Sequence, residues 1–173
     1  ASKEPLELVL PAGAHYRLGG TQLEVDGFNL TLRGSRSGAT LDAEEMSRLL
    51  FVTKGAHVEL HNLVLINGRP QLDANNRPEP DAFPGFFDFT DYGLGHGGAL
   101  AASNDSQVVL NRVSIAHCVA RLAGAIDLDM AQLDMVDSSI TNCSAGYGGA
   151  MDGLVFNATL LRSRVSDCAA RGL

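Results

Sequence analysis

The amino-acid sequence predicts an all-β fold, a single-stranded parallel β-helix of about five coils with one long lateral loop insertion. The first observation behind this prediction is a repeat. Three nine-residue phrases, LNRVSIAHC, MVDSSITNC and LLRSRVSDC, end 25 residues apart at Cys118, Cys143 and Cys168. Each of these coils opens on a related motif of small residues: GGAL, AGAI or GGAM. A fixed period of this size indicates one supersecondary unit that stacks on copies of itself.

The second observation is the apolar pattern inside the repeat, which favours strands. Apolar residues such as Val108, Leu110, Val113 and Ile115 fall in short alternating runs that Gly, Asn, Asp and Ser interrupt. No period of 3.6 residues is sustained, so a helical repeat does not fit. Three short strands in 25 residues, each pairing with its equivalent one coil away, describe a parallel β-helix.

The N-terminal part of the chain is expected to begin the same single domain, which spans residues 1–173. Residues 1–22 contain alternating leucines before a proline and a glycine, and we expect them to form an N-terminal cap and first strand. Residues 23–34 and 40–42 follow as further strands. A short helical turn is expected from Asp42, which would act as its N-cap.

The middle of the chain contains an interruption of the repeat. Residues 49–65 match residues 99–115 at a constant offset of 50, although only one coil lies between them. The additional residues form an insertion at 69–96, and regular 25-residue coils occupy 97–173. No terminating segment follows the last coil, so we expect a fragment of a longer protein or an end that associates with itself or with a neighbouring domain.

The insertion differs from the coils in composition. It carries four of the six prolines and half of the aromatic residues. Long loops without periodicity are usually functional or disordered. Two interpretations remain open: the aromatic residues fold back over the side of the solenoid, or they form a loop that binds a partner. The residues concerned are Phe83, Phe86, Phe87, Phe89 and Tyr92.

Composition and short motifs limit the partners and the compartment. The net charge is −7 with 13 Lys and Arg, which argues against nucleic acid and against an anionic membrane surface. No apolar run approaches 18 residues, so no membrane span is expected. Four N-x-[ST] sequons favour an extracellular or cell-surface location, and they mark candidate glycosylation sites. These sites are Asn29, Asn104, Asn142 and Asn157.

The alignment of the coils places acidic residues together. It predicts a ladder of Phe51, Ala101, Asp127 and Asp152, with Asp129 on the same face. Carboxylates about 4.8 Å apart repel one another unless solvent screens them or a cation lies among them. Ca²⁺ accepts irregular arrangements of oxygen ligands. The sequence therefore offers a weak Ca²⁺ site at Asp127, Asp129 and Asp152 as the alternative to a solvated acidic edge.

The three cysteines occupy one position of successive coils. They should stack about 4.8 Å apart, which lies within the Cα separation that a disulfide tolerates. Three thiols cannot all pair. A ladder of buried thiols is the favoured interpretation, because free cysteine is usually buried and a metal site would need further ligands.

These small-residue openings and Cys-terminated phrases resemble the repeats of chlamydial polymorphic outer-membrane proteins and related eukaryotic surface proteins. Those proteins belong to the pectin-lyase-like right-handed β-helix superfold, and the resemblance covers about residues 20–173. It implies a right-handed solenoid. The superfold hosts lyases, hydrolases, epimerases, adhesins and stalks, so it implies no single function. In its polysaccharide lyases and hydrolases, acids on the strand equivalent to that of Asp127 bind Ca²⁺ or act as acid and base.

The expected function is that of a non-catalytic extracellular or cell-surface β-helix, which serves as a structural, adhesive or matrix segment. The sequence contains no Ser-His-Asp set, P-loop or dinucleotide motif. The alternative is a polysaccharide-active enzyme, a lyase or glycoside hydrolase, or a carbohydrate-binding remnant of one. The acidic ladder and the aromatic insertion support this alternative.

Overall fold

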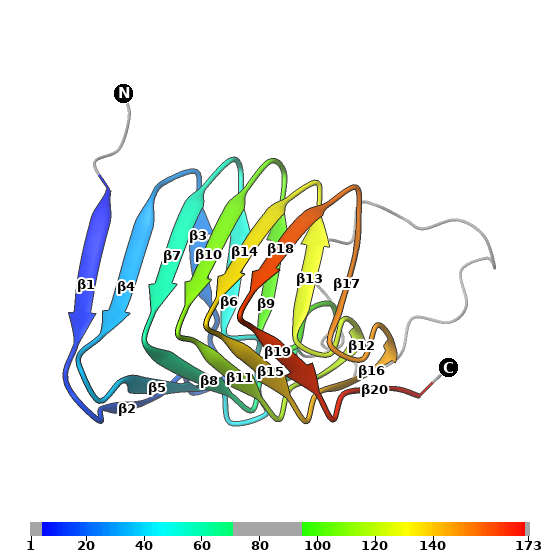
Figure 1. The fold of residues 1–173 in the computed structure, drawn as a ribbon, viewed down its shortest axis with the longest axis horizontal. Helices are drawn as coiled ribbons and strands as arrows, with labels where there is room; N and C mark the ends of the chain where they lie inside the picture. The colour runs from blue at the N-terminus through cyan, green and yellow to red at the C-terminus, as the bar shows by residue number, and fades with distance from the viewer. Residues whose placement is uncertain (1–4, 71–94, 172–173) are drawn as a thin grey trace.

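The chain forms a parallel β-solenoid of about six turns, all β, in a computed structural model that describes residues 5–70 and 95–171 (Figure 1). Four sheets run along its length, and every paired strand within them is parallel. One six-stranded sheet has the order β1 (Leu6–Leu10), β4 (Leu30–Gly34), β7 (His57–His61), β10 (Gln107–Asn111), β14 (Gln132–Val136) and β18 (Asn157–Leu161).

The other sheets hold the remaining strands of each coil. The second six-stranded sheet contains β2 (His15–Arg17), β5 (Ala39–Asp42), β8 (Leu63–Ile66), β11 (Ser114–Ala116), β15 (Ser139–Thr141) and β19 (Arg164–Ser166). A five-stranded sheet contains β3 (Leu23–Asp26), β6 (Leu50–Thr53), β9 (Leu100–Ser103), β13 (Ile126–Asp129) and β17 (Met151–Leu154). A short sheet contains β12 (Val119–Leu122), β16 (Ser144–Tyr147) and β20 (Ala169–Ala170).

The register of the strands confirms the predicted alignment of coils. Val58 pairs with Val108 at the offset of 50, and Val108 pairs with Leu133 at the offset of 25. Residues 5–18, expected to belong to a cap and first strand, instead supply two strands of a complete first coil, because β1 pairs with β4 and β2 pairs with β5. This coil is why the solenoid has about six turns, one more than expected.

The core is a column of aliphatic side chains inside the solenoid. Along β7, the inward Val58 and Leu60 are buried, and the alternating His57, Glu59 and His61 are partly exposed. Period-two alternation on each strand therefore fills the interior and leaves polar residues outside. The strands at both ends of the stack pair on one side only and leave Leu8 and Leu160 at least 40% exposed. The described part of the chain holds no helix that could cross a membrane.

Small residues in the opening motifs allow successive coils to approach closely. A Cβ added to Gly98 would overlap the carbonyl oxygen of Gly124, and a Cβ added to Gly124 would overlap that of Gly149. These glycines stack backbone against backbone, so any side chain there would separate the coils.

The helical turn expected from Asp42 is wrong. Glu44 and Glu45 have φ angles of 55° and 58°, in the left-handed region, which a right-handed helix cannot include. The segment is a tight turn, and the Asp42 carboxylate stabilises it by accepting a hydrogen bond from the Glu44 N–H at 2.8 Å. The N-cap role assigned to Asp42 is therefore wrong as well, because no helix follows it.

Candidate functional site

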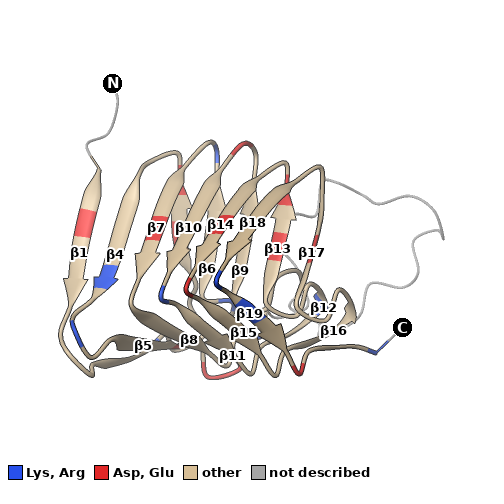
Figure 2. Cartoon of the chain, in the orientation of Figure 1, with Lys and Arg blue, Asp and Glu red and all other residues tan. Residues whose placement is uncertain are grey.

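The acidic residues of β13 lie where the alignment of coils predicted. Asp127 pairs with Ala101 on one side and with Asp152 on the other, and Ala101 pairs with Phe51. Figure 2 marks the acidic positions of β13 in red. The alternating Ile126 and Leu128 belong to the core, so the two carboxylates lie on the opposite face of the strand. They are not a solvated edge, because Asp127 is 9% exposed and Asp129 is 7% exposed.

Arg48 lies beside these carboxylates and is the most important residue that sequence reasoning missed. It precedes β6 and is 1% exposed. Its Nε and Nη2 donate to the carbonyl oxygen of His96 at 2.9 and 2.6 Å, and its Nε also lies 3.1 Å from that of Gly97. Its Nη1 donates to the Gln22 Oε1 at 3.3 Å, and the guanidinium lies 5.5 Å from the centre of the Phe51 ring.

A signal for Arg48 is present in the sequence. At the offset of 50, Arg48 occupies the position of Gly98, where the later coils have glycine. A long charged side chain at a position of close backbone approach indicates a local rearrangement. We expect such departures from a repeat to mark special sites.

His96 and the two acids complete the site around a small cavity. His96 Nδ1 lies 3.3 Å from the Asp127 Oδ2. The cavity holds about 10 Å³, roughly the space of one water molecule, and Ser103 also lines it. The Oδ1 of Asp129 is buried without a hydrogen-bond partner among the described residues. An orphan carboxylate oxygen beside a cavity of this size is the least satisfied polar atom of the site.

The electrostatics of the site are those of a buried cation between acids. Burial lowers the pKa of Arg48 to about 10, against the opposing effects of Asp127 and Glu24. Arg48 therefore stays protonated at neutral pH. Its charge interacts favourably with that of Asp127, which offsets part of the repulsion that the sequence predicted among the acids of this strand.

Asp152 does not join this cluster. It lies one strand away on β17, and its Oδ1 accepts a hydrogen bond from the N–H of Gly153 at 2.9 Å. Over residues 5–70 and 95–171, no group of three or more His, Cys, Asp or Glu side chains is arranged to hold a metal ion. A cation bound by Asp127 and Asp129 would therefore take water as its other ligands.

The remaining predicted residues divide into two groups. The asparagines of all four sequons are exposed. The proposed binding-loop residues, by contrast, lie outside the described residues: Phe83, Phe86, Phe87, Phe89 and Tyr92.

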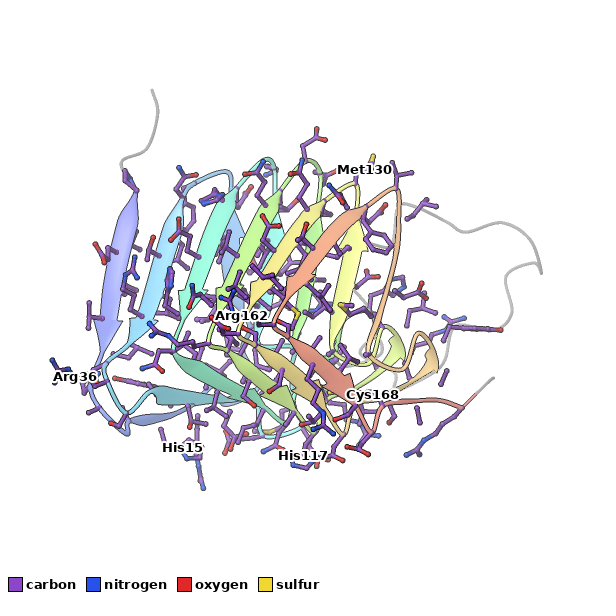
Figure 3. All side chains as sticks on the ribbon, in the orientation of Figure 1. His15, Arg36, His117, Met130, Arg162 and Cys168 are labelled. Atoms are coloured by element: carbon purple, nitrogen blue, oxygen red, sulfur yellow. The ribbon has the colours of Figure 1, made fainter. Side chains whose placement is uncertain are left out.

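In two clusters on the outer surface, the charged side chains form hydrogen bonds with one another. Arg162, labelled in Figure 3, makes a two-pronged contact with the carboxylate of Asp137, at 2.6 and 2.9 Å. On β7, Glu59 accepts hydrogen bonds from His61 at 2.9 Å and from His57 at 3.3 Å. Sequence reasoning missed the His57–Glu59–His61 cluster, although its i, i+2, i+4 spacing on a strand was the available signal.

Comparisons with known proteins give no relative. Neither a protein-family model, nor a curated protein, nor a solved structure matches the chain. The function must therefore be argued from the site itself.

Proposed function

We propose that this chain is a non-catalytic extracellular or cell-surface solenoid, which serves as a structural, adhesive or matrix segment. The observation that carries the proposal is the small size of the cavity among the charged residues described above. Asp127 and Asp129 are buried beside Arg48 and His96, around a cavity for a single water molecule. Ligand-binding pockets typically have volumes of about 300–1,000 Å³.

The alternative, a polysaccharide-active enzyme, needs carboxylates that reach a sugar. A glycoside hydrolase places two carboxyl groups on either side of the scissile bond, and one of them activates water or attacks directly. Here the candidate acids line, together with Arg48, a cavity of only about 10 Å³, which is too small for a sugar. The geometry of the described residues favours a structural role for these acids.

The compartment and the family belong to the same proposal. Four exposed sequons support an extracellular location with glycans on the outer turns. A relation to the right-handed pectin-lyase-like superfold rests on the repeat phrases, which the stacked parallel strands accommodate.

Expression in a secreting eukaryotic cell tests the compartment. We expect the secreted protein to lose mass when an N-glycosidase removes its glycans, and Asn→Gln substitutions at the four sequons to abolish that loss. Retention of the parent chain inside the cell in folded form would contradict the proposal.

Incubation with acidic and neutral polysaccharides, with and without Ca²⁺, tests the absence of turnover. We expect no new reducing ends and no unsaturated products. Turnover that disappears in Asp127→Asn, with the fold retained, would establish the enzymatic alternative.

One observation favours cation binding as a second candidate function. The unpartnered Oδ1 of Asp129 lies at the cavity beside Asp127, and oxygen ligands of this kind suit Ca²⁺. We propose a weak Ca²⁺ site at Asp127 and Asp129, without Asp152, whose carboxylate binds the Gly153 N–H instead. Calorimetric titration with Ca²⁺ should give heat that Asp129→Asn removes and that Asp134→Asn, on the exposed face of β14, retains. Absence of heat at millimolar Ca²⁺ in the parent protein would exclude the site.

A further inference from the structure

Three thiols stack along one edge of the solenoid. Cys118, Cys143 and Cys168 each follow the last strand residue of β11, β15 and β19 by two positions. The backbone ties them together, because the N–H of Ser144 donates to the Cys118 carbonyl and the N–H of Ala169 donates to the Cys143 carbonyl, both at 2.9 Å. Each Sγ lies 3.3 Å from the carbonyl oxygen two residues earlier, so the three side chains have the same orientation.

The spacing of these residues permits a bond between neighbours. All three cysteines are free. Equivalent residues of neighbouring parallel strands lie about 4.8 Å apart, and disulfides form across Cα separations of about 4.4–6.8 Å. The central thiol is the activated one: hydrogen bonds from Cys118 and then from Cys168 lower the pKa of Cys143 to about 7. The thiolate is the nucleophile of disulfide exchange, so the lowered pKa favours Cys143 as the thiol that resolves a mixed disulfide on its neighbour.

Exposure decides which neighbour reacts. Cys118 is fully buried, and its Sγ accepts a hydrogen bond from the Gly68 N–H at 3.4 Å. Cys168 is partly exposed at the turn after β19 (Figure 3). Its coil pairs on one side only, so it is freer to shift toward Cys143 than the coil of Cys118, which is held on both sides.

We propose that Cys143 and Cys168 form a reversible dithiol–disulfide pair, in which Cys168 is the point of attack on a low-molecular-weight disulfide. The Cys168 thiolate attacks that disulfide, forms a mixed disulfide and releases one small thiol. The Cys143 thiolate then attacks the Cys168 sulfur and releases the second small thiol. Two protein thiols are oxidised to one protein disulfide, and one small disulfide is reduced to two thiols.

The bond would attach the last described coil to the coil before it. Its closed loop contains one repeat, and cross-links of this kind reduce the freedom of the unfolded chain. We therefore expect oxidation to raise the unfolding midpoint by several degrees and to leave the strand content unchanged. Because burial raises the pKa of Cys168, the first step should accelerate as the pH rises above neutral.

The test uses the folded chain and oxidised glutathione as the probe. After incubation, free thiols are alkylated, and intact mass and peptide mapping locate the products. We expect the parent protein to lose two hydrogens, to contain a Cys143–Cys168 cross-link and one alkylated thiol at Cys118, and to return to three thiols with dithiothreitol. Cys118→Ala should behave as the parent does.

Two variants separate the roles of the paired thiols. Cys143→Ala should stop with one glutathione on Cys168, and Cys168→Ala should keep both of its thiols. A parent protein that keeps three alkylatable thiols while folded, or that carries glutathione without an internal cross-link, overturns the proposal. So does a Cys168→Ala variant that oxidises at the parental rate, because the pair would then be Cys118 and Cys143. The parent map decides the question even if a variant fails to fold.

Discussion

Replacing Arg48 by methionine tests the central claim about the charged site, that a buried cation holds it together. Methionine keeps most of the length of the side chain and removes its charge and its donors. We expect the free energy of unfolding to fall by about 3–5 kcal/mol, because two carbonyl groups each lose a hydrogen bond from a charged donor, worth about 1.5–3 kcal/mol apiece.

The structure supplies the reasons for this magnitude. Arg48 is 1% exposed, and it donates to the carbonyl oxygens of His96 and Gly97. Without it, these acceptors lose their donor and Asp127 loses its compensating cation. In a domain of this size each kcal/mol shifts the melting temperature by about 2–4 °C. The expected decrease in Tm is therefore about 6–20 °C.

Thermal and urea unfolding, followed by circular dichroism, measure the change. The matched control is Arg162→Met, since Arg162 is also paired with a carboxylate but lies on the exposed surface. Its unfolding midpoint should stay close to that of the parent. Asp127→Asn in the Arg48→Met background should recover part of the loss, because it removes the uncompensated charge. A Tm for Arg48→Met within 2 °C of the Arg162→Met value would refute the role assigned to the buried cation, where 2 °C is roughly the effect of 1 kcal/mol or less.

Three further predictions concern the solenoid as a whole. Gly124→Ala should destabilise the protein by about 3 kcal/mol or more, because the added Cβ would overlap the Gly149 carbonyl oxygen. The control Gly55→Ala, which has a positive φ but open space around it, should cost only about 1–2 kcal/mol. Equal urea unfolding midpoints for the two variants would contradict the close approach of the coils. Hydrogen bonds from His61 and His57 lower the pKa of Glu59 below its ordinary 4.5, so Glu59 stabilises the fold above pH 4.5 and this contribution is lost as the pH falls through the folded-state pKa. Urea midpoints measured across this range should therefore fall less in Glu59→Gln than in the parent, and parallel curves would rule the contribution out. Finally, the one-sided strands at both ends should give a mass that rises with concentration in light scattering, and a strict monomer at all concentrations would count against self-association.

The register of the solenoid could be predicted because one physical constraint repeats along the chain. Each inward residue must stack on its equivalent one coil away, so Val58, Val108 and Leu133 had to align once the period was known. The first coil was harder to predict. Residues 5–18 lack both the small-residue opening and the terminal cysteine, and only the pairing of β1 with β4 and of β2 with β5 shows that they complete a turn.

The candidate site could be predicted only in part, for a related reason. Asp127 belongs to a ladder, and ladders follow from the period. Arg48 and His96 do not, because the hydrogen bonds between them join a side chain to a main-chain carbonyl 48 residues away. The repeat gives no information about such a contact. The sequence therefore identified the acids and their repulsion. The offset of 50 marks Arg48 as a departure from the repeat, but it does not show which groups its side chain contacts.

Arg48 also explains how the solenoid continues in register across residues 69–96. The carbonyl of Ser47 accepts a hydrogen bond from the Arg69 N–H at 2.7 Å, just where the regular coil is interrupted. Arg48 binds the carbonyls of His96 and Gly97, just where the regular coils resume. The neighbouring residues Ser47 and Arg48 thus bind both ends of the interruption. Strands β6 and β9 then pair at the offset of 50, as expected for adjacent coils. The entropy of closing a loop grows only slowly with its length, so fixing its two ends matters more than the number of residues between them. The buried arginine is therefore best understood as the residue that makes an insertion compatible with a regular stack of coils, and the acids beside it as the groups that keep its charge compensated.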